Sequence, residues 1–225
     1  MHPFNKIFSE YKNSHIDETA TLFCTGPTLD KYNEADYPPS IKVGVNYIWR
    51  HKFFNQEHEG SIDLDYYFFG HRRESGNELS VEGWGESKKT AKVKSETFIP
   101  KDFKTNKEKF CVSIINGGED PNHYSVKEAV DIGAIPIAAE HGTVFPLDIS
   151  RFPLYSHSIA MPAMQFLLYC GFKKIFLVGC DCSGDDYLCQ IENWRQLKSF
   201  IDSNYPHVEI ILVNPVSLTG LFESS

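Results

Sequence analysis

A short stretch, Gly179 to Ser183, combines residue types that could bind a ligand with a position where ligands are often bound. It places Asp181 between Cys180 and Cys182, directly after an apolar run from Ile175 to Val178. An apolar run without polar alternation is typical of a strand that is covered on both faces of a parallel sheet. Because open α/β sheets bind ligands at the carboxyl ends of their strands, we expect chemistry at this stretch first.

Ser156 and Ser158 mark a second candidate, at the start of a predicted buried helix. The residues that follow are almost all apolar up to Gly171, a residue type that commonly ends helices in the left-handed conformation. Serine is a favoured N-cap, so either serine could begin this helix. The free backbone N–H groups and the helix dipole favour anions at such an end, which makes it a candidate anion site.

Two other predicted strands also end in residues with binding potential. The strand at 20–25 runs into Gly26, Pro27 and Thr28, which could form either a phosphate cradle or an ordinary tight turn. The strand at 41–45 ends on Asn46, whose amide could donate to and accept from a base or ribose, although asparagine is also a common turn residue. We keep both interpretations open at each position.

Basic and metal-binding patterns are sparse. His71 to Arg73, after a predicted strand at 65–69, could contact a phosphate or carboxylate or form a solvated loop. Cys180, Cys182 and Cys189 cluster in sequence, but their spacing matches no common zinc pattern. We therefore expect no metal site and no cofactor.

Composition restricts the class of protein. The chain has 225 residues, a formal net charge of −8 and 41% hydrophobic residues. The acidic balance argues against a nucleic-acid partner, and no apolar window reaches the length of a membrane-spanning helix. Residues 1–10 have no apolar signal-peptide core and the six cysteines lie mostly in or beside apolar runs, so we expect a cytoplasmic protein with reduced thiols. Peripheral membrane contact and oligomerisation remain open.

Strands and helices alternate along most of the chain. Further strands are predicted at 110–116, 135–139 and 208–213, further helices at 125–131 and 190–204, and an amphipathic helix that clasps the sheet within 1–19. In the polar region 74–109 we predict a helix at 86–93 and a weak strand at 97–99, with loops between them. This alternation predicts an α/β fold, a single Rossmann-like three-layer sandwich with a mostly parallel sheet over residues 1–225.

Three segments and the tail resemble those of bacterial sialyltransferases of glycosyltransferase family 42. The segments are Cys24-Thr25-Gly26-Pro27-Thr28-Leu29, Val45-Asn46, Ser158 through the helix to Gly171-Phe172-Lys173-Lys174-Ile175-Phe176-Leu177-Val178-Gly179-Cys180-Asp181, and Asn214-Pro215-Val216-Ser217-Leu218. Uncharacterised proteins similar to archaeal 6-hydroxymethylpterin pyrophosphokinase share the helix and the following Gly-x-Asp segment. Residues 71–110 match neither group.

The sialyltransferase resemblance implies transfer of an acidic sugar, sialic acid or a related 2-keto sugar, from a CMP-activated donor to a surface glycan or glycolipid. It implies inversion at the anomeric carbon and no obligatory metal. The residues that would line the nucleotide phosphate are Thr25, Gly26, Pro27 and Thr28. By the same resemblance, Asn46 would contact the donor and Ser158 the sugar carboxylate or phosphate, and the cytidine ribose would be bound by Gly179 and Asp181.

The general base is the least defined part of this hypothesis. In that family it is a histidine on a lid inserted after the Gly-x-Asp strand, and the segment from 182 to 207 is too short for such a lid. His157 is our first candidate, with His141 and His71 as others. Two further hypotheses remain: an ATP- and Mg²⁺-dependent pterin pyrophosphokinase-like enzyme, in which Asp181, Asp185 and Asp186 could hold the metal, and a non-catalytic nucleotide-binding scaffold.

Overall fold

The computed structural model describes residues 3–57, 59–70, 103–114, 124–142, 144–182 and 187–225. Its centre is one nine-stranded sheet in the order β6-β5-β4-β3-β2-β1-β7-β8-β9, and every pairing in it is parallel. The strands are β1 (Thr19–Phe23), β2 (Ile41–Val45), β3 (Tyr66–Phe69), β4 (Lys109–Ile114), β5 (Ile135–Glu140), β6 (Leu154–Tyr155), β7 (Lys174–Val178), β8 (Glu209–Val213) and β9 (Glu223–Ser224).

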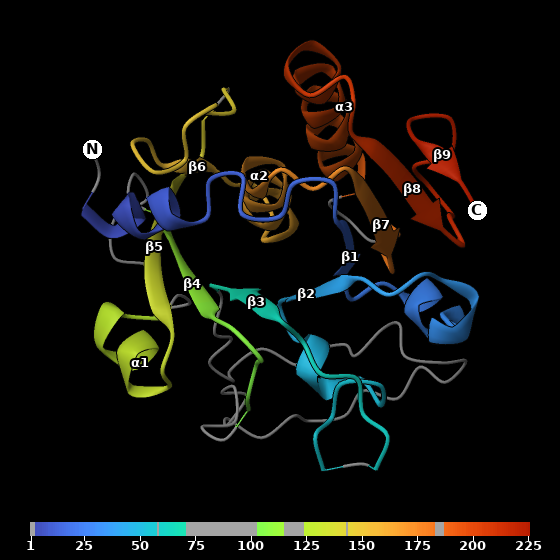
Figure 1. The fold of residues 1–225 in the computed structure, drawn as a ribbon, viewed down its shortest axis with the longest axis horizontal. Coiled ribbons are helices and arrows are strands. Elements are labelled where there is room, and N and C mark those ends of the chain that lie inside the picture. The colour runs from blue at the N-terminus through green and yellow to red at the C-terminus, as the bar shows by residue number, and fades with distance from the viewer. Residues whose placement is uncertain (1–2, 58, 71–102, 115–123, 143, 183–186) are drawn as a thin grey trace.

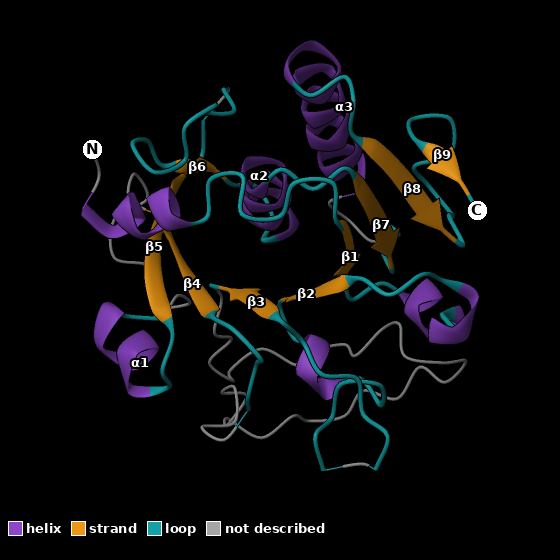
Figure 2. Cartoon of the chain, viewed as in Figure 1, coloured by secondary structure: helices purple, strands orange, loops and turns teal. Residues whose placement is uncertain are grey.

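Helices cover both faces of the sheet, which confirms the predicted three-layer α/β sandwich (Figures 1 and 2). One face carries α2 (Ala160–Cys170), α3 (Tyr187–Asn204) and the 3₁₀ helix η1 (Pro3–Glu10). The other carries α1 (Val126–Asp131) and the 3₁₀ helices η2 (Pro27–Lys31), η3 (Glu34–Asp36) and η4 (Ile48–Arg50).

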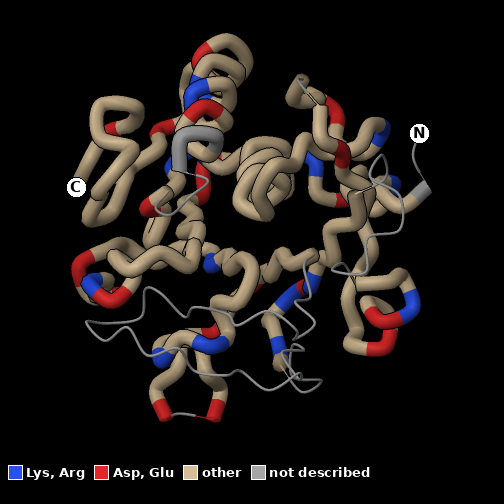
Figure 3. Tube along the Cα trace, turned by 180° about the vertical axis from the view of Figure 1, so that it is seen from behind, with Lys and Arg blue, Asp and Glu red and all other residues tan. Residues whose placement is uncertain are grey.

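The helix α2 forms the centre of the larger core, because all eleven of its residues are buried. Phe166 lies between the sheet and η1, with its ring centroid 5.4 Å from that of Phe110 and 5.8 Å from that of Phe8. The helix carries no charged residue, and it shows as an uncharged coil in the middle of the molecule (Figure 3). A helix that is apolar on all sides is stable only when it is enclosed, as α2 is here.

Of the two predicted ends of α2, only the C-terminal one agrees with the structure. Its end at Gly171 is confirmed, because Gly171 has a φ of +87° and its N–H donates to Leu168 O at 3.1 Å. The predicted serine cap is wrong, because the helix begins at Ala160 and its N-cap is Ile159, which makes no side-chain cap. Ser158 contributes its backbone carbonyl instead, which accepts a hydrogen bond from Met161 N at 3.0 Å.

The predicted short N-terminal clasp is present, as a 3₁₀ helix. Among the described residues before β1, residues 3–10 are helical, and Asn5 attaches them to the sheet. The Asn5 amide donates to Ala138 O at 3.1 Å and Phe152 O at 2.9 Å and accepts from Ala138 N at 2.7 Å. A fully buried asparagine therefore forms the attachment, through three hydrogen bonds to backbone.

The sheet changes its direction of growth between β1 and β7. From β1 the chain adds β2 to β6 on one side, returns through α2, and adds β7, β8 and β9 on the other. Phe23 is consequently in register with Gly44 of β2 and with Val178 of β7. This is the topological switch point at which α/β sheets bind ligands. The predicted helix at 86–93, the predicted strand at 97–99 and the basic residues 71–73 lie outside the described residues.

Candidate functional site

A cavity of about 290 Å³ opens at the switch point. It lies at the carboxyl ends of β1, β2 and β7, and the first turns of α2 and α3 complete its wall. Its lining consists of Cys24, Thr25, Gly26, Pro27, Val45, Asn46, Ser158, Ala160, Gly179, Cys180, Asp181, Cys182, Gln190 and Trp194. The structure therefore brings together seven of the eight predicted binding residues, Thr28 being the exception.

Thr28 lies behind the wall and holds Asp181. The Asp181 carboxylate, in a residue only 4% exposed, accepts a hydrogen bond from Thr28 N at 2.7 Å and another from the Thr28 hydroxyl. The Ser217 hydroxyl donates to the backbone carbonyl of Asp181. Asp181 is thus fixed by the protein itself, although a carboxylate has about four acceptor positions and two of them remain beyond the Thr28 contacts.

Glycine is required where the loops after β1 and β7 meet. Gly26 N donates to Gly179 O at 2.8 Å, so the two loops continue the pairing of their strands. A Cβ on Gly26 would lie 2.5 Å from that carbonyl oxygen and would also overlap Asp181 Oδ2. Gly179 has a φ of +66°, and a Cβ there would lie 2.5 Å from Cys24 O. At both positions glycine permits a close backbone approach, which the sequence indicated for Gly26 alone.

Four polar side chains in the wall have no partner within the described part of the chain: those of Thr25, Asn46, Ser158 and Gln190. All four residues are half-buried. The backbone of Asn46 is fixed, because its N–H donates to Phe68 O at 2.9 Å and its carbonyl accepts from the Tyr67 hydroxyl. The side chain of Asn46 is therefore positioned by β3 while its amide remains free for a ligand.

The first turn of α2 adds backbone donors to this wall. None of the described residues accepts a hydrogen bond from the N–H groups of Ser158 and Ile159. The dipole of an eleven-residue helix places partial positive charge at the same point. Asp181 is the only charged residue in the described lining, and its carboxylate is already held by Thr28. The described wall contains no cationic side chain, so an anion would be bound by these backbone N–H groups.

The cavity also gathers three cysteines. Cys24 follows β1, and Cys180 and Cys182 follow β7, so the fold adds Cys24 to a pair that the sequence already showed. Hydrogen bonds from the Cys180 thiol to those of Cys182 and Cys24, together with burial, raise the pKa of Cys180 well above its usual value. The side chain of Cys189, the third cysteine of the sequence cluster, lies outside the described part. In the described ranges, no set of three or more His, Cys, Asp or Glu residues is arranged to hold a metal ion.

His157 lies beside the cavity and not in its wall. Its ring is exposed and stacks on that of His141, with 5.0 Å between centroids and 28° between planes. Partial burial lowers the pKa of His157 and the neighbouring His141 lowers it further, while a hydrogen bond with the Gly142 backbone opposes both effects. His157 precedes Ser158 directly, so the candidate base lies at the rim. His71, Asp185 and Asp186 lie outside the described residues.

No family model matches the chain, nor does any curated protein. The likeness to family 42 sialyltransferases therefore stays a likeness of three short segments and a tail, and the cavity carries the functional inference. In the ranges that the structure describes, no helix combines the length and the apolar character that crossing a membrane requires.

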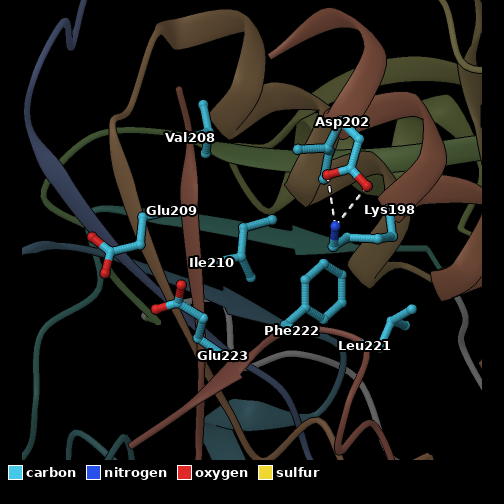
Figure 4. A pocket seen from close by; sticks show the side chains of 9 residues that line it. Lys198, Asp202, Val208, Glu209, Ile210, Leu221, Phe222 and Glu223 are labelled. Carbon is cyan, nitrogen blue, oxygen red and sulfur yellow. Dashed lines mark hydrogen bonds and ion pairs between the residues drawn. The ribbon is translucent and has the colours of Figure 1, made fainter. Parts of the chain in front are cut away.

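Two other cavities lie on the amino side of the strands. One, of about 340 Å³, lies at the start of β8 over Ile201, Ile210 and Phe222 (Figure 4), and two of its acidic groups are paired with lysines, Asp202 with Lys198 and Glu209 with Lys174. The other, of about 770 Å³, is lined mainly by the loops that precede β3 and β4. Because ligand sites of α/β sheets lie at the opposite ends of the strands, neither competes with the switch-point cavity as a functional site.

Sequence reasoning missed Gln190, Trp194 and the participation of Cys24. Gln190 lies in the first turn of α3, as Ser158 lies just before α2. The rule that pointed to the start of α2 could therefore have pointed to Gln190. No comparable signal existed for Cys24, because its place beside Cys180 depends on the pairing of β1 with β7.

Proposed function

We propose that the switch-point cavity binds the nucleotide of a CMP-activated acidic sugar, and that the protein transfers this sugar to a glycan or glycolipid acceptor. The observation that carries the proposal is the convergence of two uncommitted side chains, those of Asn46 and Ser158, with the unpartnered N–H groups at the start of α2. A free amide, a free hydroxyl and a helix N-terminus are together suited to a base or ribose and an anionic group.

The size of the cavity agrees with this assignment. Small-molecule pockets commonly measure about 300 to 1,000 Å³, and this one, at about 290 Å³, lies just below the lower end of that range. A nucleotide monophosphate would occupy it, while the sugar would extend past Ser158 toward the rim. Gly26 and Gly179 supply a wall without side chains, along which a phosphate can approach the backbone.

His157 is the residue in the described part that we assign as general base. A base must be neutral to accept the proton of the acceptor hydroxyl as that oxygen attacks the anomeric carbon and CMP leaves. The lowered pKa of His157, caused first by burial and then by His141, keeps the imidazole neutral at pH 7. Its position one residue before Ser158 supports this assignment, because the acceptor would have to approach the bound sugar from the rim of the cavity.

Nucleotide protection against thermal unfolding tests the binding step. CMP and CMP-sialic acid should raise the melting temperature without added metal, and Ser158→Ala should abolish most of this rise. Ser9→Ala is the matched control, because Ser9 is exposed on η1 and hydrogen-bonds only locally, to Lys6 O at 2.8 Å. The proposal fails if no CMP, CDP or UDP compound shifts the transition.

Turnover is tested separately, by release of CMP from CMP-sialic acid in the presence of glycan acceptors. His157→Gln should lose transfer while it keeps CMP protection. Protection by ATP only with Mg²⁺, and none by CMP, would instead favour the pterin pyrophosphokinase-like hypothesis. Nucleotide protection without turnover of any donor would favour the hypothesis that the protein is a non-catalytic nucleotide-binding scaffold.

A further inference from the structure

Three thiols that follow two neighbouring strands meet in the switch-point cavity. Cys24 follows β1, while Cys180 and Cys182 follow β7 on either side of Asp181. The two loops are held together by a hydrogen bond of 2.8 Å from Cys24 N to Val178 O. The Cys180 thiol lies within hydrogen-bond reach of both other thiols, so it is the central member of the group.

The surroundings of Cys182 favour its thiolate. Hydrogen bonds from Cys180, Ser217 and Trp194 lower the pKa of Cys182, the one from Cys180 having the largest effect, and they outweigh burial and the nearby Asp181 carboxylate. Its backbone has a φ of +44°, a conformation that side-chain-bearing residues seldom adopt. Because the thiolate is the reactive form of cysteine, we take Cys182 as the thiol that attacks an electrophile.

Two other cysteines of the same chain provide a contrast. Cys111 and Cys170 are buried in the two cores, outside the cavity lining, and burial is the main cause that raises the pKa of each to about 12. Neither combines a neighbouring thiol with a cavity that a small oxidant could enter. Thiol chemistry should therefore be confined to the cavity group.

We propose that Cys180 and Cys182 are a site of reversible oxidation, at which a peroxide converts the two thiols into a disulfide. The Cys182 thiolate attacks one peroxide oxygen, the O–O bond breaks, and the departing hydroxide takes up a proton to become water, which leaves a sulfenic acid. The Cys180 thiol then attacks the Cys182 sulfur, the S–S bond forms and a second water departs. Two thiols are oxidised and one peroxide is reduced.

The disulfide would change the wall of the cavity. It closes a ring across a single residue, Asp181, whose carboxylate is held by Thr28 and whose carbonyl is held by Ser217. Disulfide bonds tolerate only a narrow range of dihedral angles, so we expect closure of this small ring to alter the backbone around Asp181. Formation of the disulfide is independent of the proposed function, whereas its effect on nucleotide binding rests on it.

Mass mapping of the wild-type protein tests the site directly. The reduced protein is treated with hydrogen peroxide, unfolded, alkylated and digested. We expect Cys180 and Cys182 to be unalkylated, with the peptide that contains them lighter by two hydrogen atoms, and both residues to be alkylated after dithiothreitol. Cys111 and Cys170 should be alkylated throughout. Two alkylatable thiols after peroxide, irreversible sulfinic acid, or a bond between Cys24 and Cys180 would each overturn the proposal.

Paired variants then separate the thiols from the function. Cys24→Ser should keep the disulfide and Cys182→Ser should lose it, with thermal unfolding in reducing buffer to show that both are folded. In wild type, oxidation should remove CMP protection and dithiothreitol should restore it, whereas in Cys182→Ser peroxide should leave the CMP-induced shift at the value that the same variant shows in reducing buffer. Failure of CMP to protect the reduced protein contradicts the proposed function alone, while failure of the mapping contradicts the disulfide alone.

Discussion

The carboxylate of Asp181 accepts hydrogen bonds from both the backbone N–H and the hydroxyl of Thr28, across 153 positions of the chain. This contact joins the loop after β7 to the first turn of η2, on either side of the switch-point cavity. A buried carboxylate is tolerated when its oxygens have donors, and here one residue supplies two. The shape of the site therefore depends on a residue that no ligand would touch.

Removing the hydroxyl of Thr28 should destabilise the fold. Thr28→Val keeps the side-chain shape and leaves Asp181 with one donor fewer, which should lower the free energy of unfolding by about 1 to 3 kcal/mol. Urea unfolding measures this change. Thr25→Val is the matched control, because the Thr25 hydroxyl has no partner among the described residues and its loss should cost under about 0.5 kcal/mol. Equal losses of unfolding free energy in the two variants would contradict a stabilising role of the hydrogen bond from the Thr28 hydroxyl to Asp181.

A methyl group on Gly26 should damage the site. In Gly26→Ala the new carbon overlaps Asp181 Oδ2 and lies 2.5 Å from Gly179 O, a backbone atom that cannot move alone. We expect a lower melting temperature and loss of CMP protection. Gly142→Ala is a suitable control, since its nearest neighbour, Glu140 Oε1, would lie at an ordinary 3.6 Å and its φ is not positive. A Gly26→Ala protein as stable as wild type would show that the loops separate easily.

Asn46 allows binding to be separated from stability. Its φ of +54° suits asparagine and glycine, so Asn46→Gly should fold with nearly unchanged stability while it loses the free amide. We expect roughly tenfold weaker CMP binding, the loss of about one hydrogen bond, by calorimetric titration. Asn46→Ala should bind as poorly and also lose about 1 kcal/mol of stability, because it strains the left-handed backbone. CMP affinity unchanged in both variants would remove Asn46 from the site.

The stacked histidines predict a pH dependence. His157 should titrate below its ordinary pKa of 6.5, because burial and then His141 disfavour its charged form. In His141→Gln the repulsion is removed and the pKa of His157 should rise, while burial keeps it below 6.5. Proton NMR of the imidazole signals follows both changes, and an unchanged titration of His157 in this variant would contradict the pairing.

The same shift has a consequence for stability. A histidine with a lowered pKa in the folded state is protonated first in the unfolded chain, so stability is retained above pH 6.5 and falls as the pH drops below it. In His157→Gln this part of the acid dependence should disappear from chemical unfolding curves collected between neutral and mildly acidic pH. If His157→Gln lost stability at acidic pH to the same extent as wild type, groups other than His157 would be responsible for that loss.

Local sequence signals were sufficient for most of the strands and longer helices and for one glycine of the site. Apolar runs at 175–178 and 41–45 identified buried strands, and Gly26 marked a close backbone approach, because each effect acts within a few residues. The roles of Thr28 and Asp181 were not predictable. A carboxylate at a strand end has the same local sequence pattern whether it binds a ligand or accepts a hydrogen bond from a residue distant in the sequence. The position of His157 at the rim likewise depends on its contact with His141 across two loops.

Very short strands and the helix cap were also beyond sequence reasoning. The strands β6 and β9 have two residues each, too few to show a hydrophobic period. At the start of α2, two serines fitted the usual capping preference, yet the helix begins after Ile159 without a side-chain cap. Burial against the sheet holds that turn in place, so a local preference of about 1 kcal/mol did not decide the outcome.

The pairing of β1 with β7 has a consequence for synthesis of the chain. Growing from its N-terminus, the chain can pair β1 with β2 early, but the other edge of β1 stays open until Lys174–Val178 has been made. An open strand edge is a template for pairing with other chains, and closing so long a loop between parallel strands is slow. The uncharged and mostly apolar α2 is also exposed during part of this interval. The connection that creates the cavity thus leaves the nascent chain with an open strand edge and an uncovered helix, both prone to aggregation, until β7 is in place.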